Sequence, residues 1–405
     1  MNHLGRFGLA GAMLLALAAC EQQSGVKAAG GPVETANDPY RVLAPIESGN
    51  LILFPVVRAG SKSPGATPFI TLDEGIRNGE VEVTEAGKVR GLVRPRGAEP
   101  VFPVDRSRGD EVNTLVLVNH SRQPLLLLAG EIVTGGKQDR VIARDRIVHA
   151  DADPIDLSVF CIEPGRWTES SATFGAAAKA SAGSFMVQPT VRQQAMVAKD
   201  QQQVWNSVHG AISGLAIAAA PQANSALDAG SGGPFPRSIG TTSYAKAMQD
   251  SSVSAKVDEA AAPVMKSRDQ VLAQLRQEHA IGVVVAVRGE IVWADLFADT
   301  ELLSRYWTKL VRSYAAESLI AGETHPAPAV ADAQRFLDAP SGGTETSEGE
   351  VGVYRYRELK AGGAETFVLE SLLPGTGYDV HISKLKLRNA EHRPKPLVYS
   401  PQIYR

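Results

Sequence analysis

The chain has 405 residues, of which 44% are hydrophobic and 21% are charged, and its formal net charge is −3. This composition is typical of a soluble globular protein with a sizeable core, long enough for two or three domains. No run of Lys and Arg is interleaved with aromatic residues, so the sequence lacks the basic footprint that nucleic-acid binding requires. We therefore expect no nucleic-acid partner.

The first 20 residues predict an export signal. Arg6 supplies a positive charge, and the uncharged segment Phe7–Ala19 is shorter than the roughly 20 residues that a membrane-spanning helix needs. Leu17, Ala18, Ala19 and Cys20 resemble a lipobox, in which the cysteine is diacylated and becomes the mature N-terminus. Two acyl chains anchor a protein stably. The same N-terminal segment has two alternative interpretations: an ordinary secretory signal with a chance cysteine, and an apolar N-terminal helix.

The lipobox places the protein in a bacterial cell envelope, facing the periplasm. Glu21 stands where inner-membrane retention signals have Asp, which favours the outer membrane.

Residues 21–39 are small and polar and are predicted to form a flexible tether. Cys161 is the other cysteine of the chain, so lipidation of Cys20 leaves no partner for an intramolecular disulfide.

Folded structure is expected from Tyr40 onward, with an α+β fold that has a β-rich N-terminal core. Short apolar runs separated by turn residues predict mostly antiparallel sheet over residues 51–161. Thr71 and Glu74 match a capping box, which predicts a short helix after Thr71.

Over residues 190–213 the apolar residues recur at the spacing of a helix and no longer at that of a strand, which predicts one long amphipathic helix. A mobile loop is expected over residues 219–240, because they are rich in Ala, Gly, Ser and Pro. Two more helices are predicted over residues 244–260 and 267–279.

Residues 281–297 predict a buried β-hairpin with Gly289 in its turn. Asp299 is the expected N-cap of a helix over residues 300–320, whose apolar stripe would cover that hairpin. Residues 341–349 are expected to form a loop. A C-terminal β-rich segment over residues 350–405 then carries strands at 351–359, 365–372 and 378–386.

Polar residues follow two buried runs, at residues 130–140 and 161–167, and are expected to converge at one sheet edge. Glu131 follows an apolar strand, where burial would raise its pKa. Lys137, Arg140 and Arg166 suit an anionic group. Alternatively, Glu131 pairs with Lys137 or Arg140 across a turn. The complete set of predicted binding residues is Glu131, Lys137, Gln138, Asp139, Arg140, Arg166 and Trp167.

Other catalytic or metal-binding patterns are weak. His149 lies near Asp151 and Asp153, a pattern that suits either a metal or acid–base group or a solvated loop. No Cys/His set has zinc spacing, and neither a Gly-x-Ser-x-Gly elbow nor a phosphate-binding loop occurs. We therefore assign no catalytic residue, metal or cofactor from the sequence.

Six segments carry a resemblance to a known family: residues 50–57, 70–74, 128–140, 161–167, 203–205 and 281–297 with the helix that follows. They resemble the ADP-ribosylglycohydrolase- and rhodanese/phosphatase-superfamily-associated protein domain family. This resemblance implies a family domain over residues 40–322 and no assigned biochemical function. The family usually has Gly-Ala-Lys-Gln-Asn-Arg where this chain has Gly, Gly, Lys, Gln, Asp and Arg at residues 135–140.

Three functions remain open. The first is a membrane-anchored, non-catalytic module that binds a small anionic ligand, such as a nucleotide or sugar phosphate, or an envelope protein. The second is an envelope hydrolase that acts on a phosphorylated or glycosidic substrate with Glu131 or Glu163 as acid or base. The third is a structural envelope protein.

Overall fold

A computed structural model of the chain describes residues 40–58, 69–85, 92–93, 102–103, 114–166, 168–176, 178–179, 183–220, 239–266, 273, 275–339 and 343–387. These residues belong to one compact unit, Asn37–Arg405. The predicted lipobox with Cys20, the tether at residues 21–39 and the candidate Trp167 lie outside the described residues. The fold is α+β, as predicted.

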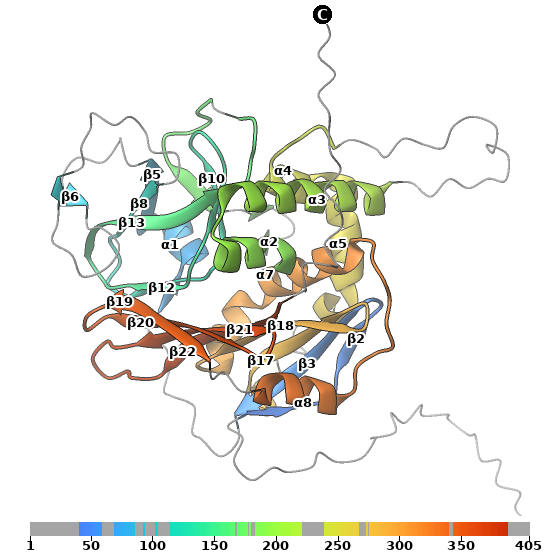
Figure 1. Cartoon of the computed structure of the whole chain (residues 1–405). Coiled ribbons are helices and arrows are strands. Elements are labelled where there is room, and N and C mark those ends of the chain that lie inside the picture. Colours follow the sequence, from blue (N-terminus) through green and yellow to red (C-terminus); the bar gives the residue numbers. More distant parts are fainter. Residues whose placement is uncertain are drawn as a thin grey trace, which may run out of the picture. The chain divides into compact units, whose positions relative to one another are not determined.

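A nine-stranded antiparallel sheet forms the larger layer of the domain (Figure 1). The sheet joins strands from both ends of the described chain, because the C-terminal β22 pairs with β18 and the N-terminal β3 pairs with β17. Its order is β1 (Tyr40–Val42), β3 (Leu51–Arg58), β17 (Ala280–Val287), β18 (Glu290–Phe297), β22 (Asp379–Lys386), β21 (Ala364–Ser371), β20 (Tyr354–Ala361) and β19 (Thr344–Glu350), with β2 (Ile46–Ser48) also paired to β3.

Both faces of the central strands are buried, which explains their continuous apolar sequences. On one face, Val283 and Val285 pack in the main core with helix α7 (Thr300–Leu319). On the other face, Val284 packs with helix α8 (Val330–Asp338), which Figure 1 shows across the sheet from α7. The predicted hairpin is confirmed, and so is the helix capped by Asp299, whose carboxylate accepts a hydrogen bond from the backbone N–H of Leu302 at 2.7 Å.

A second, six-stranded antiparallel sheet has its own apolar core. The capping box at helix α1 (Leu72–Asn78) is confirmed, because Thr71 and Glu74 bond each other's backbone N–H groups. The sheet order is β14 (Phe174–Ala176), β10 (Ile132–Gly135), β11 (Arg140–Ile142), β13 (Ala152–Cys161), β8 (Thr114–Asn119) and β5 (Val81–Glu85). The smaller groups are β12 (Arg146–Val148), β9 (Leu125–Leu127) and β4 (Ile70–Thr71); β15 (Ala178–Lys179) with β16 (Gly183–Ser184); and β6 (Leu92–Val93) with β7 (Phe102–Pro103).

The prediction of one long helix over residues 190–213 is wrong. The segment is divided into α2 (Pro189–Gln193), a π-helical turn η3 (Gln194–Ala198) and α3 (Gln201–Ala219). Lys199 ends the π-helical turn in a left-handed conformation, with φ of 54°. Asp200 then caps α3 by accepting a 2.8 Å hydrogen bond from the backbone N–H of Gln203.

Other sequence predictions also need correction. The predicted helix over residues 244–260 is two helices, α4 (Tyr244–Gln249) and α5 (Ser251–Lys266), separated at Asp250. The loop expected at residues 341–349 is largely strand β19, which pairs with β20, and α8 was not predicted. Most of the expected loop at 219–240 lies outside the described residues.

Candidate functional site

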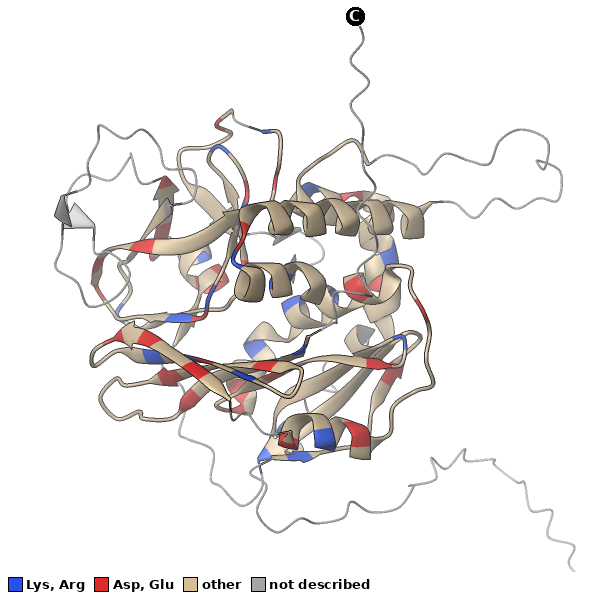
Figure 2. Ribbon diagram, in the orientation of Figure 1, with Lys and Arg blue, Asp and Glu red and all other residues tan. Residues whose placement is uncertain are grey.

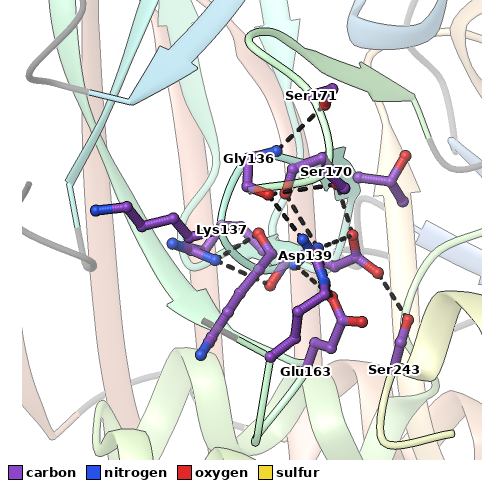
Figure 3. Close-up of polar contacts among 12 residues, drawn as sticks. Gly136, Lys137, Asp139, Glu163, Ser170, Ser171 and Ser243 are labelled. Carbon is purple, nitrogen blue, oxygen red and sulfur yellow. Dashed lines mark hydrogen bonds and ion pairs between the residues drawn. The ribbon is translucent and has the colours of Figure 1, made fainter. Parts of the chain in front are cut away.

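The two polar groups that were expected to converge do meet. Arg140 on β11 pairs with Cys161 on β13, which brings the β10–β11 turn beside the segment that follows β13. The backbone N–H of Asp139 then donates to Oε2 of Glu163 at 3.2 Å. Figure 3 shows Gly136, Glu163 and Ser243 gathered around Asp139. We call these four residues and Arg166, which contacts Glu163, the Asp139 cluster.

Asp139 is only 4% exposed and is held by hydrogen bonds on both carboxylate oxygens. Oδ2 accepts from Ser243 Oγ at 2.7 Å, and Oδ1 accepts from the backbone N–H of Gly135 at 3.1 Å. Burial raises the pKa of Asp139, the hydrogen bond from Ser243 opposes that rise, and the charge of Glu163 adds to it. The two neighbouring carboxylates are therefore electrostatically coupled.

Arg166 holds the β10–β11 turn through hydrogen bonds to its backbone. Its Nε donates to Oε2 of Glu163 at 2.6 Å, and its Nη1 donates to the carbonyl oxygens of Gly136 at 2.7 Å and Thr168 at 3.0 Å. Nη2 reaches the carbonyl oxygen of Gly135 at 3.3 Å. Every guanidinium nitrogen therefore already has an acceptor within the protein, and the role of Arg166 here is to fix the turn and orient Glu163.

Ser170 and Ser171 complete the same turn (Figure 3). The backbone N–H of Ser170 donates to the Gly136 carbonyl at 2.9 Å, and the Gly136 N–H donates to Ser171 Oγ at 3.3 Å. Gly136 has a φ of 50°, and a Cβ at this position would lie 2.3 Å from the Phe174 ring. The turn requires glycine for both reasons.

A pocket of about 430 Å³ opens beside the Asp139 cluster. Glu163 forms part of its wall and is 2% exposed, whereas the side chain of Lys246 is 58% exposed. The Lys246 ammonium lies 3.1 Å from Oε1 of Glu163. We call this feature the Lys246 pocket, and its described lining residues are Glu163, Gly165, Arg166, Gly240, Thr241, Thr242 and Lys246.

Glu131 lies in a different place from the rest of the predicted set. It is 1% exposed, and its Oε1 pairs with Nζ of Lys309 on α7 at 2.6 Å, not with Lys137 or Arg140. Lys309 also pairs with Asp73 at 2.7 Å. Burial raises the pKa of Glu131 and the charge of Lys309 opposes that rise. This buried ion pair connects α7 to the second sheet.

Gln138 and Arg140 are buried and do not line the pocket. Arg140 donates from Nη1 to the Gln138 carbonyl, and its Nη2 lies 3.6 Å from Oε1 of Glu85. The backbone N–H of the half-buried Lys137 also donates to Glu85, at 3.1 Å. Of the predicted binding residues that the structure describes, only Arg166 lines the Lys246 pocket.

Sequence reasoning missed a second, fully buried polar network. The imidazole of His381 lies between Asp145, 2.6 Å from Nδ1, and Asp295, 3.2 Å from Nε2. Arg192 pairs with Asp295 at 2.8 Å, and Ser383 donates to the same carboxylate at 2.8 Å. These residues are at most 1% exposed and come from four separate segments, so no local motif signals them.

Lys246, Thr241 and Thr242 were also missed, because they follow an Ala- and Gly-rich segment and lie about 80 residues beyond Glu163 in the sequence. Within the described residues, no group of three or more His, Cys, Asp and Glu is arranged to hold a metal ion. A helix long and apolar enough to cross a membrane is likewise not found among them.

Comparison with known proteins places the chain in a family. Searches of curated proteins and of solved structures found no match. A family model does match residues 39–385, which include the hairpin, α7 and the C-terminal strands. The chain therefore belongs to the family of the ARG and rhodanese-phosphatase-superfamily-associated protein domain, to which no biochemical function is assigned.

Proposed function

We propose that this protein is a lipid-anchored component of the bacterial envelope whose family domain binds a small sugar-phosphate-like ligand in the Lys246 pocket. The observation that supports the proposal is the pocket itself. It combines a largely exposed ammonium, a fixed carboxylate and two threonines in about 430 Å³, a volume within the usual range for small-molecule sites.

The two sides of the pocket suit different parts of such a ligand. The Lys246 ammonium offers a positive point charge to a phosphate. The Glu163 carboxylate accepts hydrogen bonds from sugar hydroxyls, and the hydroxyls of Thr241 and Thr242 either accept or donate them. Arg166 holds Glu163 at 2.6 Å, so the carboxylate is oriented before a ligand arrives. This arrangement supports specific recognition.

Binding without turnover is the better supported alternative. Glu163 is the one carboxylate among the described lining residues, whereas Asp139 is held by Ser243 and Gly135, and Glu131 pairs with Lys309. Acid–base hydrolysis of a glycoside ordinarily requires two carboxylates that face the substrate. The hydrolase remains the second candidate because Glu163 is buried, lies at the pocket wall and is coupled to Asp139.

A thermal-shift screen of the chain from Asn37 tests ligand binding. The panel contains sugars, sugar phosphates, nucleotides, ADP-ribose and inorganic phosphate. A ligand at about 100 times its Kd stabilises the folded state by roughly 2.7 kcal/mol. We expect sugar phosphates to raise the Tm more than the matching sugars do. If no member of the panel raises the Tm, the proposed ligand class is wrong.

Turnover separates the two candidate functions. Product formation from a ligand found in the screen, abolished in Glu163→Gln while the Tm shift remains, would favour the hydrolase. Stable ligand without product supports the binding module.

The lipid anchor has its own test. Mass spectrometry of the detergent fraction of cells that express the full chain is expected to find a lipid-modified peptide that begins at Cys20. An unmodified mature N-terminus at another residue would contradict the anchor.

A further inference from the structure

A second pocket, of about 280 Å³, shares no described lining residue with the Lys246 pocket. We call it the Arg144 pocket. It lies where the β11–β12 connection and β13 meet the π-helical turn, and Arg144 and Lys199 are its two cationic side chains. Its other described lining residues are Ala143, Ser158, Val159, Phe160 and Ala195.

The backbone at this pocket is unusual. Ala195 belongs to the π-helical turn η3, and Lys199 follows it in the left-handed conformation that residues with a Cβ rarely adopt. Single π-helical turns are frequently found at functional sites. Here the turn and the left-handed residue together bring Ala195 and Lys199 into one pocket wall.

Both cations already hold carboxylates from a distant part of the chain. Nζ of Lys199 lies 2.7 Å from each carboxylate oxygen of Glu358, and Nη1 of Arg144 contacts both oxygens of Glu348. The two glutamates lie on the β19–β20 hairpin, residues 344–361, which we call the acidic hairpin. Figure 2 shows its acidic residues beside the basic β12 segment, where Arg146 and Glu350 form a third pair at 3.8 Å.

The acidic hairpin presents its two carboxylates as a pair. In the β19–β20 register Glu358 lies opposite Thr346, two residues from Glu348, so the two glutamates are diagonal neighbours on one face of the hairpin. The two cations that line the pocket therefore face two negative groups at once.

The Arg144–Glu348 contact is exposed, with side chains that are 28% and 48% exposed. An exposed ion pair of this kind contributes little to stability and is screened by salt. In the second pair Lys199 is 37% exposed and Glu358 is 9% exposed, so the Lys199 ammonium is the accessible partner. β19 is also the edge strand of the sheet, and its first five residues are exposed.

We propose that the Arg144 pocket is a second anion site, specific for small diphosphate-class anions, and that Glu348 and Glu358 hold its two cations as an internal substitute ligand. An external diphosphate displaces the two carboxylates, pairs with Arg144 and Lys199, and releases the acidic hairpin from this face. Arg144 suits a phosphate through its fork of donors, and Lys199 supplies a point charge. The site is independent of the Lys246 pocket.

Calorimetric titration of the full-length chain in detergent with sodium pyrophosphate tests this proposal, against sodium chloride of equal ionic strength. If the hairpin occupies the cations about nine-tenths of the time, its neutralisation in the double variant Glu348→Gln/Glu358→Gln tightens the apparent Kd about ten-fold. The matched control Glu345→Gln/Glu370→Gln makes the same change in net charge on the same sheet, and it should leave the Kd within about two-fold of wild type.

The variant Arg144→Gln/Lys199→Gln should lose pyrophosphate binding, with a melting transition that shows it is folded. The proposal is overturned if this variant still binds, if the two double glutamate variants have equal affinity, or if citrate binds and pyrophosphate does not. Failure of pyrophosphate to bind either wild type or Glu348→Gln/Glu358→Gln also overturns it.

Discussion

Nδ1 of His381 lies 2.6 Å from Oδ2 of Asp145, although the two residues are 236 positions apart in the sequence. Nε2 of the same imidazole faces Asp295 at 3.2 Å. Nδ1 hydrogen-bonds to Asp145, and Nε2 lies within ion-pair distance of Asp295, so the two carboxylates that flank the ring favour the charged imidazolium. The contact joins the C-terminal strand β22 to the β11–β12 connection.

This geometry predicts a loss of stability in alkali. The carboxylates raise the pKa of the buried His381 to about 9, against burial, from an unfolded value of about 6.5. Because the folded state holds the proton more tightly, the stabilisation is fully present below pH 6.5 and is lost as pH rises toward 9. Urea unfolding should show a loss on the order of 3 kcal/mol across this window. The loss should be absent in His381→Gln and retained in His209→Gln, an exposed control.

The Glu131–Lys309 pair is predicted to be structural. Lys309→Met leaves Glu131 and Asp73 without the ammonium that both now contact, and Glu131 is fully buried. Breaking a buried pair in this way costs about 3–5 kcal/mol. Lys256→Met removes an exposed 2.8 Å pair with Glu259 and should cost less than about 1 kcal/mol. Similar unfolding free energies for the two variants would argue against this role.

Gly282 is predicted to be required for the central pairing of β17 with β18. A Cβ at this position would lie 2.1 Å from the carbonyl oxygen of Asp295 and 2.7 Å from Cα of Leu296, both backbone atoms. Gly282→Ala should therefore destabilise the domain by about 1–3 kcal/mol. Apart from the backbone of its own helix and its two chain neighbours, Gly210 on α3 has no atom within 4 Å of such a Cβ, so Gly210→Ala should stabilise by about 0.5–1 kcal/mol. Equal effects in chemical denaturation would refute this difference.

Cys161 is predicted to be unreactive in the folded protein. Its side chain is 1% exposed, and burial raises the pKa of the thiol, although the charge of Arg140 lowers it. In the chain from Asn37 it is the only cysteine. Labelling by a thiol reagent should be at least about 100-fold slower than in urea, because it requires opening of the structure. Fast labelling without denaturant would show an accessible thiolate.

Local signals in the sequence correctly predicted local structure. Three features were predicted correctly: the β17–β18 hairpin, the Asp299 cap and the Thr71–Glu74 capping box. Each depends on residues only a few positions apart, so it can be predicted from the sequence alone. The prediction of one helix over residues 190–213 failed because the apolar spacing continues through Lys199, where a left-handed residue ends the π-helical turn and Asp200 caps the next helix.

The candidate site was only partly predictable. The meeting of the β10–β11 turn with Glu163 and Arg166 follows from two adjacent strands, and sequence reasoning anticipated it. The partner of Glu131 is Lys309, 178 residues away, and Lys246 reaches Glu163 from a separate helix. Such partners depend on tertiary packing, which a single sequence does not encode in any local pattern.

The central claim is that Lys246 and Glu163 form a ligand site, and an equilibrium titration tests it most directly. The sugar phosphate with the largest thermal shift is titrated into the chain from Asn37, its Lys246→Ala variant and the exposed control Lys256→Ala. Loss of the charge–phosphate contact should raise the Kd about ten-fold or more for Lys246→Ala, since a hydrogen bond to a charged group contributes about 1.5–3 kcal/mol. The control should match wild type. Equal Kd values for all three proteins would show that the ligand binds elsewhere and contradict the proposed site.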